Sequence, residues 1–223
     1  MPNWCKIEFD VRGTPEALAR FKAGVEGVVG ERLRAFDFNR MIPMPPELNI
    51  DCGSIGDVGY EAFYGDAGNV LGYPWLRSKG IVTTEQLREY LRSENPQYFE
   101  LGTKYHENLQ KFGHQTWYTW CREAWGTKWN ACDSSVEETA EGLSYRLETA
   151  WSFPEPVFEA MAANFPDVSI EGRMDEEGGY FHGTFTAQDG ALTMNYLEGI
   201  RKGGPYDYDD EAEDSDEGTD SAG

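Results

Sequence analysis

The sequence has few basic residues and no long apolar run, and each shortage excludes a class of protein. Its 19 Lys and Arg stand against 40 Asp and Glu, which gives a net charge of −21. Nucleic-acid binding depends on cations that neutralise phosphates, so we expect no direct contact with nucleic acid. No stretch approaches the roughly 20 apolar residues of a membrane span, and the chain opens without a charged-then-apolar leader. We therefore expect a cytoplasmic protein without membrane contact.

Metal-binding and cofactor-binding motifs are also missing. Cys5, Cys52, Cys121 and Cys132 form no CxxC pair, and the three histidines form no HxxxH pair. Two minor alternatives to ordinary buried thiols are a structural metal site from Cys121, Cys132 and His114 and a nucleophilic Cys121 with a histidine partner. No phosphate-binding Walker loop or dinucleotide-binding glycine motif occurs. We therefore expect no metal and no cofactor.

The sequence is rich in aromatic rings, with 7 Trp, 12 Tyr and 12 Phe among 223 residues. This ring surface predicts a folded core. Residues 5 to 11 alternate apolar with charged side chains, which is the period of a half-buried strand. Thr14 and Pro15 predict the start of a helix, and residues 33 to 39 predict a second strand that completes a β-α-β unit. The apolar stripe of the helix consists of Leu18, Phe21, Val25 and Val28.

A second β-α-β unit is predicted late in the chain. Residues 143 to 151 alternate as a strand whose buried face includes Leu147 and Trp151, next to the buried face of residues 5 to 11. A helix follows from Ser152 and Pro154, and residues 168 to 174 form the next strand. The Asp-Gly pair at 189 and 190 then predicts a hairpin.

Two such units predict an α+β, ferredoxin-like split β-α-β sandwich, with a large, mostly helical insertion between the halves and an extra C-terminal hairpin. The Gly- and Pro-rich residues 41 to 74 of the insertion should be mostly loop. Thr83 and Gln86 predict a capping box, and Gly113 should end a later helix. The predicted divisions are residues 1–40 for the first half, 41–133 for the insertion, 134–200 for the second half with the hairpin, and 201–223 for an acidic disordered tail.

Residues 113 to 131 hold four of the seven tryptophans. A helix that ends at Gly126 gives them an apolar arc of roughly 140°, which consists of Trp117, Trp120, Cys121 and Trp125. The arc favours a core face, and Trp120 at its edge is the ring expected nearest the surface. The alternative is an exposed patch that binds a partner, because Trp, Tyr and Arg concentrate binding energy. The residues predicted for partner binding are Tyr118, Trp120, Lys128 and Trp129.

Several segments of the chain resemble one family in order. These segments are MPNWC, VRG, FNRMIPMP, WYTWCREAWGTKWNA and LETAWSFPEPVFEAMAANFP, between Met1 and about Phe185. They are similar to the YubB-like family, the Api-type ferredoxin-like domain of plasmids, phages and genomic islands. The resemblance implies a ferredoxin-like fold and a mobile-element origin, and it supplies no catalytic residues.

The charge distribution guides the expectation for function. Nine carboxylates and no Lys or Arg lie between Tyr206 and the C-terminus, and the remaining 31 acids and 19 bases leave −12 on the body. We expect a non-enzymatic accessory protein of a mobile element that binds a basic or nucleic-acid-binding protein, with counter-defence as one such role. The alternative is an enzyme with a site in the cleft between the sheet and the insertion. A deep polar pocket would favour the enzyme, and an aromatic patch would favour the binding protein.

Overall fold

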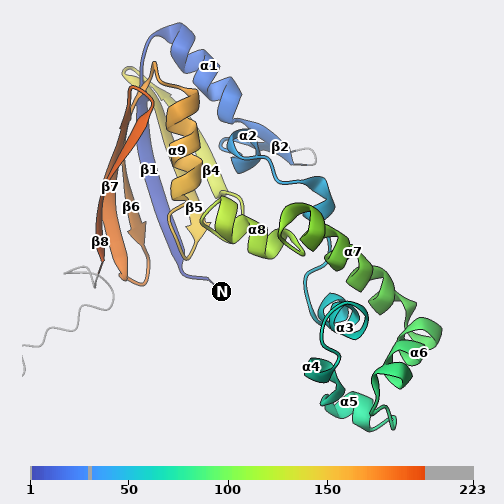
Figure 1. The fold of residues 1–223 in the computed structure, drawn as a ribbon. Coiled ribbons are helices and arrows are strands. Elements are labelled where there is room, and N and C mark those ends of the chain that lie inside the picture. Colours follow the sequence, from blue (N-terminus) through green and yellow to red (C-terminus); the bar gives the residue numbers. More distant parts are fainter. Residues whose placement is uncertain (1, 30–31, 199–223) are drawn as a thin grey trace, which may run out of the picture.

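The chain is built around one antiparallel six-stranded sheet with helices on one face (Figure 1). The computed structural model describes residues 2–29 and 32–198. The strands of the sheet are β1 (Trp4–Arg12), β4 (Cys132–Thr139), β5 (Gly142–Ala150), β6 (Ser169–Glu176), β7 (Phe181–Gln188) and β8 (Ala191–Glu198). Their order is β4-β5-β1-β6-β7-β8, and every neighbouring pair is antiparallel.

Two helices cross over between strands of this sheet. Helix α1 (Pro15–Val25) follows β1 on the path to β4, and α9 (Glu155–Asn164) joins β5 to β6. Strand β5 lies between β1 and β4, and β1 lies between β5 and β6. Each helix-linked pair of strands is therefore separated by one strand of the other unit. This interleaving is the split β-α-β topology of a ferredoxin-like sandwich, and β7 and β8 extend it at one edge.

Local sequence signals determine where these elements begin and end. The apolar side chains of β1 at positions 5, 7, 9 and 11 are buried, and Lys6 and Glu8 face away from the core. Thr14 caps α1, because its Oγ1 accepts a hydrogen bond from the Ala17 amide at 3.2 Å. The C-terminal hairpin is present, with Asp189 and Gly190 at φ 52° and 82° in its turn.

The strand predicted at residues 33 to 39 is wrong. Residues Gly27–Val29 (β2) and Arg32–Arg34 (β3) form a separate two-stranded ribbon, and Phe38–Met41 form the short helix α2. The apolar pattern there arises because the rings of Phe36 and Phe38 enter the main core. Val28, predicted in the core stripe of α1, lies on the ribbon and is 67% exposed. Strand β4 takes the predicted place in the sheet.

The insertion consequently lies inside the first β-α-β unit, between α1 and β4, and not between the two halves as predicted for residues 41 to 133. A hydrogen-bonded clasp joins its two ends. The Asn130 side chain donates to Asp37 Oδ1 at 2.6 Å and accepts from the Phe38 amide at 2.9 Å. Arg34 donates to the Ala131 carbonyl at 2.7 Å. The clasp holds segments more than 90 residues apart against the same edge of the core.

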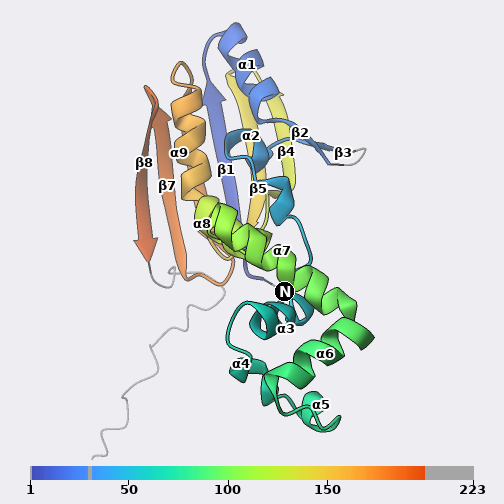
Figure 2. The ribbon, with the colours of Figure 1, turned by 45° about the vertical axis from the view of Figure 1, so that its right-hand side comes forward.

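The insertion is helical (Figure 2) and has an apolar core of its own. Besides α8 (Trp117–Ala124), which packs on the main core, its helices are η1 (Pro46–Leu48), α3 (Ser54–Phe63), α4 (Gly68–Leu71), α5 (Pro74–Arg77), α6 (Thr84–Glu94) and α7 (Pro96–Phe112). The capping box at Thr83 and Gln86 is confirmed, and Gly113 ends α7 at φ 75°. The prediction that residues 41 to 74 are mostly loop misses α3 and α4.

The glycine content of this segment predicted loops, but some of these glycines lie where two helices pack closely together. Gly59 of α3 lies against Gly102 of α7, and a β-carbon on Gly59 would lie 1.8 Å from the Tyr98 carbonyl oxygen. A β-carbon on Gly102 would in turn lie 2.3 Å from the Gly59 backbone. Only glycine allows the two helix backbones to approach this closely.

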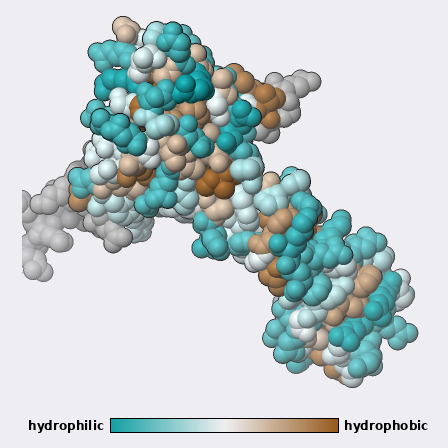
Figure 3. Space-filling model, turned by 45° about the horizontal axis from the view of Figure 1, so that its top comes forward, coloured by the Kyte–Doolittle hydropathy of each residue, from teal (hydrophilic) through white to brown (hydrophobic). Residues whose placement is uncertain are grey.

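The visible surface is largely hydrophilic, and its apolar areas are scattered over both the sheet region and the insertion (Figure 3). Within residues 2–29 and 32–198, no helix is both long and apolar enough to span a membrane. The acidic segment predicted as a tail, residues 201 to 223, lies outside the described residues.

Candidate partner-binding site

The aromatic helix α8 (Trp117–Ala124) carries a core face and a solvent face. It begins at Thr116, whose Oγ1 accepts a hydrogen bond from the Tyr118 amide, and it ends before Gly126 at φ 75°. Cys121 and Trp125 are buried as predicted, and the Trp125 indole donates a hydrogen bond to the Ile42 carbonyl at 2.9 Å. The buried side fixes the orientation of the opposite side.

Three of the four residues predicted for partner binding lie close together. The Lys128 ammonium is 4.5 Å from the ring centroid of Trp129 and 5.4 Å from that of Tyr118. It also lies 5.2 Å from the ring centroid of Trp151. Such cation–π contacts hold a lysine head against aromatic faces. The lysine is therefore surrounded by three rings that come from two parts of the chain.

The fourth residue, Trp120, lies elsewhere. Its ring packs edge-on against Trp125 at 5.4 Å between centroids, and it is partly buried at the margin of the main core. Trp120 is more exposed than the buried Trp125, as expected, but its apolar contact is with the Trp125 ring and it does not join the rings around Lys128.

Sequence reasoning missed three members of this site. Trp4 at the start of β1 lies 6.3 Å from Trp129, and Trp129 lies 6.0 Å from Trp151, both between ring centroids. The Arg122 guanidinium lies 5.6 Å from the Tyr118 ring. The six residues are called the aromatic–basic cluster below. It consists of Trp4, Tyr118, Arg122, Lys128, Trp129 and Trp151.

Trp151 has an unusual backbone that directs its ring outward. It was predicted on the buried face, but β5 ends at Ala150 and Trp151 adopts φ 66° with its side chain 48% exposed. Positive φ is rare for a bulky residue and costs about 1–3 kcal/mol. The Trp151 amide donates to the Asn3 carbonyl at 2.9 Å, and the Thr149 hydroxyl donates to the Ser152 carbonyl at 2.6 Å. These bonds hold the turn in the strained conformation.

A hollow of about 440 Å³ lies beside the cluster, between α8 and the end of β5. Its walls include Tyr118, Arg122, Lys128 and Trp151. No His, Cys, Asp or Glu is among its lining residues, so it contains no ordinary general base. Within the described residues, no carboxylate lies within ion-pair distance of Arg122 or Lys128.

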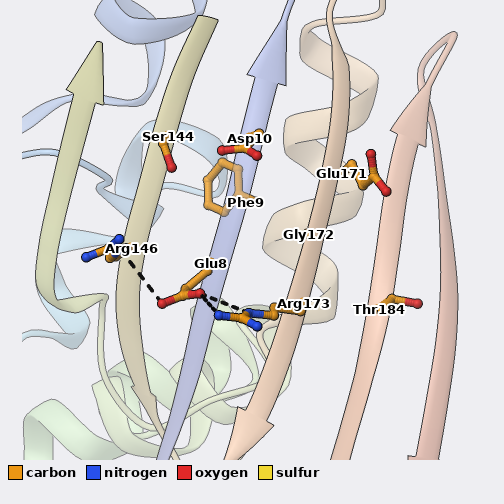
Figure 4. A pocket seen from close by; sticks show the side chains of 9 residues that line it. All are labelled: Glu8, Phe9, Asp10, Ser144, Arg146, Glu171, Gly172, Arg173 and Thr184. Carbon is orange, nitrogen blue, oxygen red and sulfur yellow. Dashed lines mark hydrogen bonds and ion pairs between the residues drawn. The ribbon is translucent and has the colours of Figure 1, made fainter. Parts of the chain in front are cut away.

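A second hollow of about 430 Å³ lies on the open face of the sheet (Figure 4). Here Glu8 of β1 pairs with Arg173 of β6 at 2.9 Å and with Arg146 of β5 at 3.8 Å. Asp10 and Glu171 also line it. Its cations are already matched by acids, which is the ordinary state of a solvated sheet face, and exposed pairs of this kind contribute little energy.

The structure gives no support to catalysis by Cys121. Burial raises the pKa of Cys121 to about 12, and burial likewise raises the pKa of Cys5 to about 12. A nucleophilic cysteine needs a lowered pKa, so both thiols stay protonated at neutral pH. In the part of the chain that the structure describes, no three His, Cys, Asp or Glu side chains are grouped as metal ligands.

Burial of these thiols predicts a loss of stability in alkaline solution. The free energy of unfolding contributed by each thiol should be constant below the ordinary pKa of 9.0 and fall as the pH rises toward 12. In this window the unfolded chain loses thiol protons that the folded chain retains. The loss should be on the order of 1 kcal/mol per thiol at pH 10. Denaturant titrations at pH 8, 9 and 10 measure it.

Two cysteine variants separate this effect from other titrations. Cys121→Ala should reduce the fall in unfolding free energy between pH 9 and 10, whereas Cys52→Ala, at an exposed position, should leave it unchanged. An equal fall in the protein and in Cys121→Ala would show that this thiol ionises alike in both states.

The match to a family model agrees with the ferredoxin-like fold. Residues 124–220 match the family model described as the ferredoxin-like domain in Api92-like protein. A crystal structure of the protein api92 from Yersinia pseudotuberculosis is similar at 10% sequence identity, over 90% of this chain and 99% of that one, with a TM-score of 0.44. No curated protein matches the chain.

Proposed function

We propose that this chain is a non-catalytic binding protein that docks a partner protein on the aromatic–basic cluster. The observation that carries the proposal is the convergence of Trp, Tyr and Arg on one exposed site around Lys128. These residue types dominate the energetic centres of protein interfaces. The strained backbone of Trp151 adds support, because strain of this kind is concentrated at functional sites.

The charge of the chain indicates the kind of partner. With a net charge of −21, the protein attracts basic surfaces and steers them toward itself. A cytoplasmic protein that binds nucleic acid has a basic surface, and we infer that the partner is of this kind. The resemblance of several sequence segments to YubB-like proteins of plasmids and phages supports an accessory role in a mobile element by association. Counter-defence, by blocking a host factor of this kind, is the form of that role that the charge favours.

The alternative function is an enzyme with its site in the hollow between the sheet and α8. The hollow has a suitable place and volume for a small substrate. Its lining supplies two cations and hydroxyl groups, but it supplies no carboxylate, imidazole or thiol to transfer a proton. The lining therefore favours binding over catalysis.

The decisive experiment compares two single-ring variants. Trp151→Gly removes the exposed ring, and glycine adopts φ 66° without strain, so the fold should persist. Partners captured from a lysate of the encoding organism are purified, and their Kd is measured by calorimetry. Loss of a central interface ring costs about 2 kcal/mol or more, which corresponds to roughly 30-fold weaker binding.

The matched control is Tyr180→Ser, which removes a ring that is 67% exposed on the turn between β6 and β7. This variant should bind as the unchanged protein does. A purified partner whose Kd is the same for the protein and for Trp151→Gly would place the interface away from the aromatic–basic cluster.

A further inference from the structure

The hollow beside the aromatic–basic cluster has hydrogen-bond donors to spare. Its two aliphatic hydroxyls already donate to backbone carbonyls, Thr127 to Ala150 at 2.8 Å and Ser152 to Gly126 at 2.6 Å. Among the described residues, the side-chain donors of the hollow without a hydrogen-bond acceptor are the Arg122 guanidinium, the Lys128 ammonium and the Tyr118 hydroxyl. These donors match a ligand that has several hydrogen-bond acceptors.

The charges in the hollow point to an anion. Arg122 and Lys128 lie against the same ring, at 5.6 and 5.4 Å from the centroid of Tyr118. Within residues 2–29 and 32–198 neither has a carboxylate within ion-pair distance, although acids outnumber bases two to one in the chain. Two cations that line one hollow make its potential positive, and a bound anion offsets that charge. A phosphate monoester, with a charge of about −1.5 to −2, matches the two cations.

The ring walls indicate what carries the anion. The Trp151 side chain is 48% exposed and borders the hollow, which leaves ring surface free for stacking. The volume of about 440 Å³ falls within the range of small-molecule sites. A phosphate monoester whose molecule also contains a planar ring can place its phosphate at the two cations and its ring on Trp151.

We propose that the hollow between α8 and the end of β5 binds a phosphate monoester whose molecule also contains a planar aromatic ring. Its source is either a phosphotyrosyl side chain of the docked protein or a free nucleotide. The first source rests on the proposed function, whereas the second does not. Arg122 and Lys128 hold the phosphate, and Trp151 holds the ring.

The test titrates phenyl phosphate into the full chain and follows tryptophan fluorescence and calorimetric heat. We expect saturable binding with a Kd on the order of 0.1 mM for a ligand of this size. Arg122→Gln and Lys128→Gln should each weaken it at least tenfold. Trp151→Gly should weaken phenyl phosphate but leave the weaker binding of inorganic phosphate unchanged, because only the former stacks.

The matched control is Lys79→Gln, since Lys79 also lies over a ring, 5.4 Å from the centroid of Tyr90, but in the insertion. It should bind phenyl phosphate as the unchanged protein does. Arg122 is exposed, so Arg122→Gln remains informative even where Lys128→Gln lowers stability. Any of three results would overturn the proposal. The first is no saturation below about 10 mM, which is a very weak affinity. The second is equal binding by both charge variants and the unchanged protein, and the third is equally tight binding of phenol.

Two further ligands identify the source of the phosphate. N-acetyl phosphotyrosine amide represents the side chain of a partner, and adenosine monophosphate represents a free nucleotide. A tenfold preference for either one supports the site and names its source. Because these titrations use no partner protein, their failure overturns the phosphate site alone, and loss of partner binding in Trp151→Gly still tests the docking function.

Discussion

Replacing Trp125 by alanine is expected to lower the free energy of unfolding by about 3–5 kcal/mol, as for other large buried rings. The Trp125 side chain is 3% exposed and packs edge-on against Phe38 at 5.7 Å between centroids. Its removal leaves a cavity between α8 and α2 and deprives the Ile42 carbonyl of its hydrogen bond. Equilibrium denaturation by urea measures the change.

Trp120→Ala is the matched control for this substitution. Trp120 is only partly buried and contacts Trp125 from the side, so its loss should cost about half as much or less. The same variant should bind a partner normally, because Trp120 does not line the hollow. A larger loss of stability for Trp120→Ala than for Trp125→Ala would invert the assignment of the two faces of α8.

Gly59→Ala is expected to disrupt the insertion and leave the sheet folded. The new β-carbon would meet the Tyr98 carbonyl oxygen at 1.8 Å, and this neighbour is backbone that cannot rotate away. Overpacking costs about 1–3 kcal/mol where side chains can shift, and more where they cannot. Hydrogen exchange should show lost amide protection in α3 and α7. Protection in β1 and β5 should persist because the sheet has a separate apolar core.

Gly72→Ala provides the control for the change of glycine to alanine. Gly72 has φ −73°, and a β-carbon there has no atom within 4 Å. Alanine at a compatible site stabilises by up to about 1 kcal/mol through the unfolded chain. Unchanged amide protection of α3 in Gly59→Ala would show that the two helices can separate without cost.

The sequence predicted the elements whose signals are local. Strand β1, the capped start of α1, β5, α9 and the final hairpin all have strong alternation, caps or turn residues. Strand β4 was missed because it is an edge strand whose residues 132 to 139 are mostly polar and mostly exposed. Residues 33 to 39 have the stronger apolar pattern, but their rings enter the core without pairing in the sheet.

The candidate site was predicted only where it is contiguous in sequence. Tyr118, Lys128 and Trp129 lie on one helix and the turn after it, so their proximity follows from local structure. Trp4 and Trp151 join them through the pairing of β1 with β5, where Trp4 lies opposite Ala150. Strand pairing between such distant segments depends on the whole fold. The apolar alternation of residues 143 to 151 also continues through Trp151. It therefore gave no sign that the backbone turns after Ala150 and directs the Trp151 ring outward.

The position of the insertion inside the first β-α-β unit shapes how the chain can fold during synthesis. Strand β1 lies at the centre of the sheet, but both of its neighbours, β5 and β6, begin only after residue 141. At about 5–20 residues per second, the ribosome needs roughly 7–30 s to extend the chain from β1 to the end of β5. Until β5 is made, the apolar face of β1 can be covered only by earlier segments of the same core, which are α1, the rings of Phe36 and Phe38, and later α8. The helical insertion emerges meanwhile with a core of its own, and once its ends are clasped at Asp37 and Asn130 the long connection behaves as a short one. A folded insertion thereby lowers the entropy cost of bringing β4 to the sheet.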